Sequence, residues 1–120
     1  MKQISWGIIG TGSIASAFAH SIEHCSYSKL SGVYGRNAEA LNVFSKKFKV
    51  EPFKDIESFL DTSDIDAVYV ATPHNTHFKY SLEAIKNNKH VLCEKPLTMN
   101  HLESMILLNL AKDKELFLME

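Results

Sequence analysis

The 120-residue sequence lacks the features that mark a nucleic-acid-binding, membrane-spanning or secreted protein. Its 13 basic and 14 acidic residues give a formal net charge of −1, so it has no basic excess for nucleic acid or an anionic membrane. The longest uninterrupted aliphatic run, from Met105 to Leu108, is four residues long, whereas a transmembrane helix needs about 20. No apolar segment with a cleavage site follows Met1, so we expect no signal peptide. We therefore expect a soluble protein that binds neither nucleic acid nor a membrane.

Cysteine and arginine are both scarce. Cys25 and Cys93 are the two cysteines and form no Cys-x-x-Cys pair, which favours free thiols in a reducing compartment and a cytoplasmic location. Arg36 is the one arginine among the 13 basic residues. The length and the 45% hydrophobic content are typical of one globular domain over residues 1–120.

Short β-rich runs alternate with helical patterns along the whole sequence. This alternation predicts an α/β Rossmann fold, in which a doubly wound, six-stranded, mainly parallel sheet carries helices on both faces. The expected strands cover residues 3–9, 29–34, 51–53, 66–71, 90–93 and 116–119.

Three observations describe the helices between these strands. A stripe of Ile14, Phe18 and Ile22 predicts the apolar face of the first helix. Asn37, Asp55 and Thr76 are expected to cap the next three helices, because their side chains accept hydrogen bonds from free backbone N–H groups. The last helix, 101–112, carries an apolar run on more than one face. Either a further partner covers this helix or it lies deep in the core.

The loop after the first strand matches the pattern G-x-G-x-x-A, in the residues Gly10, Thr11, Gly12, Ser13, Ile14 and Ala15. Gly10 permits a tight turn, and Gly12 lets the backbone approach a pyrophosphate because it has no Cβ. The helix N-terminus then offers N–H groups and a positive dipole to the anion. The alternative is a tight turn that binds nothing, but the strand before the loop and the helix after it favour a dinucleotide site.

The end of the second strand bears on the choice of cofactor. NAD-specific sites place a carboxylate there for the ribose hydroxyls, but this sequence has Gly35 followed by Arg36. A guanidinium pairs with a 2′-phosphate through two hydrogen bonds and stacks on adenine. The pattern therefore favours NADP over NAD, with an ordinary surface arginine as the alternative.

Several other motifs are not expected to bind a metal ion or a nucleic acid. His20, Glu23 and His24 match H-x-x-E-H, a zinc-peptidase pattern, but they lie on the polar side of the first helix with no further ligand evident, so we expect no metal site. Cys93 falls in an expected strand and is interpreted as a small buried apolar residue. Phe44, Phe48, Phe78 and Tyr69 are interpreted as core aromatics and not as a nucleic-acid platform.

Together with the glycine loop, two further motifs carry a family resemblance: the segment 71–77, Ala-Thr-Pro-His-Asn-Thr-His, and Cys93-Glu94-Lys95-Pro96. With these motifs the chain resembles the N-terminal domain of the glucose–fructose oxidoreductase/inositol dehydrogenase superfamily. The nearest branch is that of dihydrodiol dehydrogenases and NADP-dependent pentose dehydrogenases. The resemblance covers essentially the whole chain.

The resemblance implies a nicotinamide cofactor lying across the carboxyl ends of the strands. It implies that Glu94 hydrogen-bonds near the nicotinamide ribose and that Lys95 is catalytic, pointing at the substrate hydroxyl or carbonyl. Without the motif, Lys95 would be interpreted as a solvated lysine, and His74 is equally well an ordinary loop residue. The further cofactor contacts that the resemblance implies are Ala71, Thr72, Pro73, His74, Asn75, His77 and Lys95.

The resemblance also implies a second domain of roughly 200 residues that carries substrate contacts, an acid–base partner and the homo-oligomer interface, and we expect this domain to lie outside the chain. The expected function is that of the NADP-binding domain of an oxidoreductase acting on a CH–OH group of a sugar, polyol or cyclic diol. Two alternatives remain open. One is a non-catalytic sensor that binds NAD(P), and the other is an enzyme that cleaves glycosides through transient oxidation.

Overall fold

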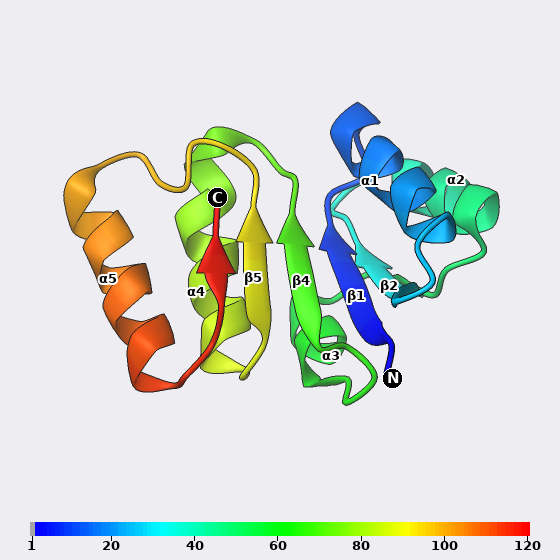
Figure 1. The fold of residues 1–120 in the computed structure, drawn as a ribbon. Helices are drawn as coiled ribbons and strands as arrows, with labels where there is room; N and C mark the ends of the chain where they lie inside the picture. The colour runs from blue at the N-terminus through cyan, green and yellow to red at the C-terminus, as the bar shows by residue number, and fades with distance from the viewer. Residues whose placement is uncertain (1) are drawn as a thin grey trace.

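Six parallel strands form one sheet in the computed structural model, which describes residues 2–120 (Figure 1). The strand order is β3-β2-β1-β4-β5-β6, and every neighbouring pair is parallel. The order reverses between β1 and β4, which is the point where doubly wound sheets bind ligands at the carboxyl ends of their strands. The predicted Rossmann fold is confirmed. The strands are β1 (Ile4–Ile9), β2 (Ser28–Tyr34), β3 (Pro52–Phe53), β4 (Ala67–Val70), β5 (His90–Cys93) and β6 (Leu118–Met119).

Helices cover the two faces of the sheet unequally. On one face α1 (Ser13–Glu23) and α2 (Ala38–Phe48) pack beside β1 and β2, as Figure 1 shows. The other face carries the remaining helices, α3 (Ile56–Asp61), α4 (His77–Lys86) and α5 (His101–Asp113). Strand β4 shows why both layers form, because Val68 and Val70 pack towards the second layer and Tyr69 packs towards the first. A strand buried on both faces needs a continuous apolar sequence, as β4 has.

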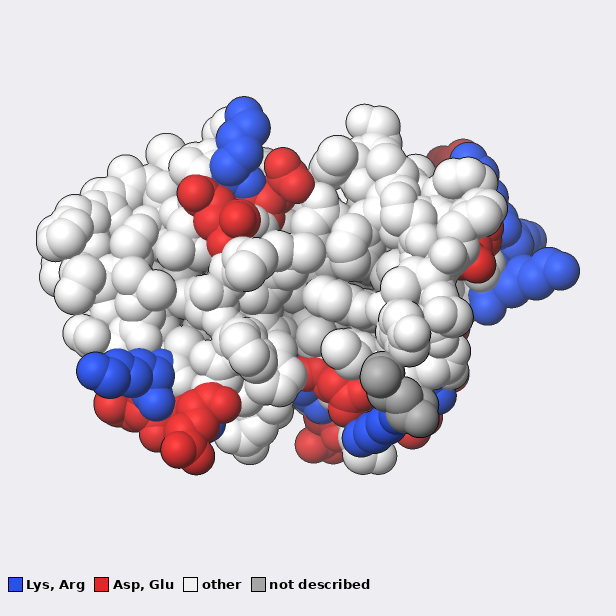
Figure 2. Space-filling model, in the orientation of Figure 1, with Lys and Arg blue, Asp and Glu red and all other residues white. Residues whose placement is uncertain are grey.

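Within residues 2–120, no helix covers the sheet face over β4 to β6 on the side of α1 and α2. Leu92 of β5 is half-buried there, and Met119 of the edge strand β6 is exposed. In the space-filling view, charged side chains gather near the two ends of the strands and are nearly absent from the surface between them (Figure 2). This half of the sheet therefore exposes an apolar surface.

Two of the three expected helix caps are confirmed. The Asn37 side chain accepts from the backbone N–H of Ala40 at 2.9 Å, and the Asp55 side chain accepts from that of Ser58 at 3.0 Å. The expected cap at Thr76 is wrong, because its side chain makes no capping bond to α4. A 3₁₀ turn, η1 (His74–Thr76), precedes α4 and turns this hydroxyl back onto its own loop.

Two expectations about apolar helix faces also need correction. Ile14 does not belong to the buried stripe of α1 but is 49% exposed, and the small residues Ala15 and Ala19 pack on the sheet instead. Helix α5 buries Leu107 and Ala111 but exposes Ile106 and three other large apolar residues. The interpretation that α5 lies deep in the core is therefore wrong, because α5 packs at the edge of its layer.

Candidate functional site

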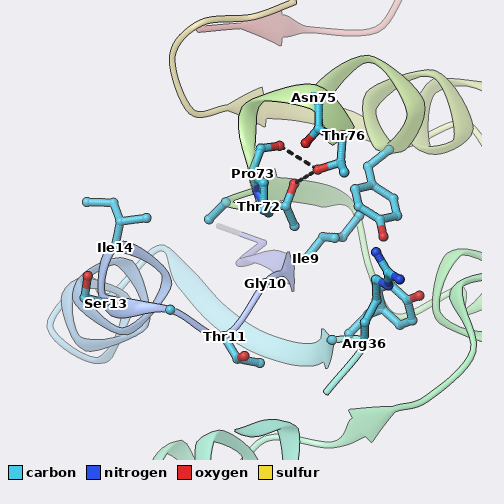
Figure 3. A pocket seen from close by; sticks show the side chains of 15 residues that line it. Ile9, Gly10, Thr11, Ser13, Ile14, Arg36, Thr72, Pro73, Asn75 and Thr76 are labelled. Atoms are coloured by element: carbon cyan, nitrogen blue, oxygen red, sulfur yellow. Dashed lines mark hydrogen bonds between the residues drawn. The ribbon is translucent and has the colours of Figure 1, made fainter. Parts of the chain in front are cut away.

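A cavity of about 650 Å³ opens at the carboxyl ends of β1, β2 and β4, where the strand order reverses. It brings together three of the segments singled out in the sequence, which are the glycine loop, the end of β2 and the loop after β4 (Figure 3). The lining residues are Ile9, Gly10, Thr11, Gly12, Ser13, Ile14, Tyr34, Gly35, Arg36, Ala71, Thr72, Pro73, Asn75, Thr76 and Tyr80.

The first glycine of the loop is required by the fold of the chain itself. Gly10 has φ +119°, a conformation that side-chain-bearing residues rarely adopt, and a Cβ there would overlap the carbonyl group of Ala71. Its N–H donates to the carbonyl of Tyr34 at 2.8 Å. Gly10 thus joins the ends of β1, β2 and β4 where they form the floor of the cavity.

The second glycine has a different role. Gly12 has an ordinary φ of −80°, and a Cβ at this position would meet no atom of the chain within 4 Å. The packing of the chain therefore gives no reason for a glycine here. The free space lies at the cavity, so the missing Cβ leaves room for a ligand to approach the backbone.

The N-terminus of α1 adds an electrostatic preference for anions. Gly12 is its N-cap and has no side chain that could accept from the first N–H groups, and the first turn has no acidic residue. These N–H groups and the positive end of the helix dipole are therefore available to an anion in the cavity.

The cavity lining contains one formally charged side chain, that of Arg36. Arg36 follows the end of β2 and lies at the side of the cavity, as Figure 3 shows. No carboxylate is among the lining residues. Burial raises the pKa of the neighbouring Tyr80, Tyr34 raises it further, and the Arg36 charge opposes both effects. The phenol thus stays neutral beside the guanidinium, and the net charge of the lining favours an anion.

The loop after β4 forms a wall of the cavity. The Thr76 hydroxyl is hydrogen-bonded to the Thr72 hydroxyl at 2.6 Å and to the Pro73 carbonyl at 2.7 Å, as Figure 3 shows. Thr72, Pro73 and Asn75 line the cavity, whereas the exposed His74 of the same loop does not. The internal bonds hold the wall in one conformation.

Glu94 and Lys95 lie outside this cavity, beyond the carboxyl end of β5. The Tyr69 hydroxyl donates to the Glu94 carboxylate at 2.7 Å, and the Tyr69 ring stacks on Phe18 with 4.1 Å between the centroids. Burial raises the pKa of Tyr69, and the bond to Glu94 raises it further, so the phenol keeps its proton and remains a donor. Glu94 is thereby oriented, while Lys95 is exposed.

His77 does not line the cavity, although the resemblance implied a contact with the cofactor. Its side chain is fully buried, with Nε2 at 2.8 Å from the Thr72 carbonyl oxygen and Nδ1 at 2.6 Å from the Pro96 carbonyl oxygen. Because both polar edges of the ring are engaged by the backbone, His77 lies behind the wall and presents no free edge to a ligand.

Four lining residues were not anticipated from the sequence: Ile9, Tyr34, Thr76 and Tyr80. Ile9 and Tyr34 are the last residues of β1 and β2, so their positions at strand ends beside the glycines could have indicated them. Tyr80 comes from the second turn of α4, and no local pattern shows that it reaches the cavity.

The sequence profile of a family described as "Oxidoreductase family, NAD-binding Rossmann fold" matches residues 4–120. The chain belongs to this family. The resemblance identified from the glycine loop and the Glu-Lys-Pro motif is thereby confirmed.

Individual relatives share the whole domain with the chain. Glucose-6-phosphate 3-dehydrogenase of Bacillus subtilis is 36% identical over 112 residues, which are 93% of this chain and 31% of that protein. NADP(+)-dependent D-xylose 1-dehydrogenase of Hypocrea jecorina is 32% identical over 98% of this chain and 33% of its own length. A 3-ketoreductase from Actinomadura kijaniata, solved with NADP and TDP-benzene, superposes with a TM-score of 0.94 at 31% identity, covering 99% of this chain and 37% of that one. The chain thus spans about a third of the length of these relatives.

The motif H-x-x-E-H lies on the outer surface of α1, away from the cavity. His20, Glu23 and His24 are exposed on α1, with 3.6 Å between His20 Nδ1 and Glu23 Oε2. Residues 2–120 contain no group of three or more His, Cys, Asp or Glu side chains suited to a metal ion. In the same residues, no helix has the length and apolar character needed to cross a membrane.

The two thiols of the domain are expected to differ sharply in reactivity. Cys93 is 1% exposed, and burial raises the pKa of its thiol to about 11. Cys25 is exposed, and hydrogen bonds from Ser28 and the backbone lower the pKa of its thiol. At pH 8 iodoacetamide should alkylate Cys25 and leave Cys93 unmodified, because the thiolate is the reactive form.

Mass spectrometry of the digested protein measures both sites in one experiment. In denaturant both cysteines should react, which provides the control. Equal labelling of the two thiols in the folded protein would contradict the buried position of Cys93.

Proposed function

We propose that this chain is the NADP-binding domain of an oxidoreductase that transfers a hydride between the cofactor and a CH–OH group of a sugar, polyol or cyclic diol. The observation that carries the proposal is the cavity at the reversal of strand order. It combines a glycine loop, an uncapped helix N-terminus and Arg36, and it has no carboxylate among its lining residues. These are the features of a site for a dinucleotide with several negative charges.

The preference for NADP rests on the end of β2. Gly35 occupies the place where NAD-specific sites hold an acidic residue, and the next residue, Arg36, lines the cavity. A Cβ at Gly35 would come within 2.9 Å of the Thr11 side chain, so the glycine also lets the two loops close around the cavity. The guanidinium of Arg36 would pair with the 2′-phosphate, and the NADP-dependent xylose dehydrogenase supports this choice.

The dinucleotide would span the carboxyl edge of the sheet. Gly10 to Ile14 and the start of α1 would hold the pyrophosphate, and Gly35 and Arg36 would hold the adenosine end. Ala71, Thr72, Pro73 and Asn75 would form the wall beside it. The nicotinamide end would then extend towards Glu94, which Tyr69 orients.

The nicotinamide ring, when bound, accepts or supplies the hydride. Loss of a hydride from an alcohol carbon is matched by loss of a proton from its oxygen. Lys95 lies exposed on the same edge of the sheet, where its ammonium would stabilise the negative charge that develops on this oxygen. We therefore assign Lys95 the catalytic role, with Glu94 and His74 flanking the nicotinamide end.

We place the substrate contacts, the acid–base partner and the homo-oligomer interface in a further domain, because the relatives are about three times as long as the chain. The substrate class follows the sugar and diol dehydrogenases among these relatives, which include trans-1,2-dihydrobenzene-1,2-diol dehydrogenase of Danio rerio. Cys25 and Cys93 are free thiols, which supports a reducing, cytoplasmic location.

Calorimetric titration of the chain with NADPH and with NADH tests the cofactor assignment. NADPH is expected to bind at least about tenfold more tightly than NADH, a difference of about 1.4 kcal/mol. Arg36→Ala should remove this preference, because the 2′-phosphate then loses its cationic partner. Lys46→Ala removes the same charge from the exposed end of α2 and should leave the preference intact.

The titrations distinguish the preference for NADP from dinucleotide binding itself. Equal binding of NADH and NADPH by the wild-type chain would assign the site to NAD and leave Arg36 without a role in selectivity. Failure of both dinucleotides to bind would contradict the proposed function.

A further inference from the structure

His77, the first residue of α4, connects two loops that meet at the carboxyl edge of the sheet. One ring nitrogen contacts the carbonyl of Thr72, five residues back in the chain, and the other contacts the carbonyl of Pro96, 19 residues ahead. Thr72 belongs to the cavity wall, and Pro96 directly follows Lys95. The imidazole therefore lies between the proposed cofactor site and the proposed catalytic lysine.

Within residues 2–120, the contact of His77 Nδ1 with the Pro96 carbonyl is the one hydrogen bond between residues 72–77 and 95–97, and the contact of Nε2 with Thr72 anchors the ring to its own loop. The other bonds of the two loops run elsewhere. Thr76 bonds within its own loop, and the N–H of Leu97 donates to the Glu120 carboxylate at 2.7 Å. At the strand ends the Glu94 N–H donates to the Val70 carbonyl at 2.9 Å, and beyond this point the imidazole is the polar link between the wall and the turn that carries Lys95.

The burial of His77 makes the loss of either polar contact costly. The side chain has no exposed area, so any polar edge that lost its partner would remain without water. A carbonyl oxygen accepts and does not donate, so a neutral ring donates its one N–H to one of these two carbonyls. A change in the separation of the two loops would pull the Pro96 carbonyl away from the ring that Thr72 faces on the other side, so the buried ring holds the separation at one value.

We propose that His77 is a positioning residue, which sets the place of Lys95 relative to the nicotinamide end of the cofactor without touching the cofactor. The inference rests on the proposed function, because the nicotinamide end is assigned to the side of Lys95. The positioning role predicts different effects on the two halves of NADPH. Loss of the link should disturb the nicotinamide half and spare the adenosine half, which Arg36 and the glycine loop hold.

The test compares NADPH with adenosine 2′,5′-bisphosphate, which keeps the adenosine and the 2′-phosphate but lacks nicotinamide. His77→Phe keeps a ring and removes both polar contacts, whereas His77→Gln retains an amide N–H that can reach one carbonyl. Calorimetry of the chain should show NADPH affinity lowered at least about tenfold in His77→Phe and less in His77→Gln, with bisphosphate affinity changed less than about twofold.

Ser81→Ala is the matched control. Ser81 is buried one turn further along α4, and its hydroxyl has no hydrogen-bond partner within residues 2–120, so its removal perturbs the same helix without breaking a bond. Both ligands should bind this variant as they bind the wild type. Equal loss of both ligands in folded His77→Phe, or unchanged binding of both, would overturn the positioning role.

A ligand-free measurement separates this inference from the proposed function. In ¹⁵N-labelled wild-type chain, a His77 ring N–H should exchange slowly with water, and in His77→Gln the amide resonances of Lys95 and Leu97 should shift while that of Gly12 stays in place. Fast ring exchange, or unshifted Lys95 and Leu97 resonances, would overturn the link even if His77→Phe fails to fold. If the link holds but wild-type chain binds neither ligand, the proposed function fails and the assignment of His77 to cofactor positioning fails with it.

Discussion

Gly12→Ala is expected to abolish NADPH binding and leave the free energy of unfolding within about 1 kcal/mol of the wild-type value. The backbone of Gly12 is in an ordinary extended conformation, and the new Cβ would contact no atom of the chain within 4 Å. The methyl group would instead occupy the space through which a pyrophosphate approaches the loop. We expect affinity to fall at least about a hundredfold, or about 2.7 kcal/mol.

Calorimetry with NADPH and urea denaturation followed by circular dichroism measure the two quantities separately. The separation matters because a simple loss of folding would also abolish binding. Tight NADPH binding by Gly12→Ala would show that the phosphates lie elsewhere in the cavity, and would contradict the assignment of the loop.

Gly10→Ala, the same chemical change two residues earlier, is expected to unfold the chain or destabilise it by about 3 kcal/mol or more. At φ +119° an alanine is strained, and its Cβ would overlap the backbone carbonyl of Ala71 at the end of β4. Because this overlap is with backbone and not with a flexible side chain, relief requires β1 and β4 to separate. These strands are neighbours in the centre of the sheet.

Urea denaturation of the two glycine variants side by side provides the comparison, with Gly12→Ala as the matched control. A Gly10→Ala chain that unfolds at the wild-type urea concentration would contradict the observed backbone conformation. The two glycines thus separate the requirements of the fold from those of the ligand within one short loop.

The architecture was predictable from the sequence because its signals are local. Runs such as 67–70 are apolar throughout, which is typical of strands buried on both faces, and Asn37 and Asp55 cap helices through contacts three residues away. The right-handed crossover rule then favours a doubly wound sheet. The glycine loop and Arg36 were found in the same way, since the ends of β1 and β2 follow directly from the positions of the strands.

Which side chains line the cavity depends on contacts between segments distant in the sequence, and hydrophobic periodicity does not predict such contacts. The spacing of Ile14 matches the buried stripe of α1, but the helix meets the sheet through Ala15 and Ala19, and Ile14 is left at the cavity. Tyr80 reaches the cavity because α4 packs beneath the wall, and the 3₁₀ turn before α4 redirects the Thr76 hydroxyl.

His77 shows most clearly the difference between what the sequence predicts and what tertiary contacts determine. Its motif indicated a contact with the cofactor, whereas its position between the Thr72 and Pro96 carbonyls depends on how two loops pack after β4 and β5. The sequence by itself determined the Rossmann fold, the position of the glycine loop and the basic residue after β2, because short-range patterning and backbone sterics suffice for each. Only the tertiary structure decided which side chains reach the cavity and which lie behind it, because burial and hydrogen bonding there join residues from separate elements.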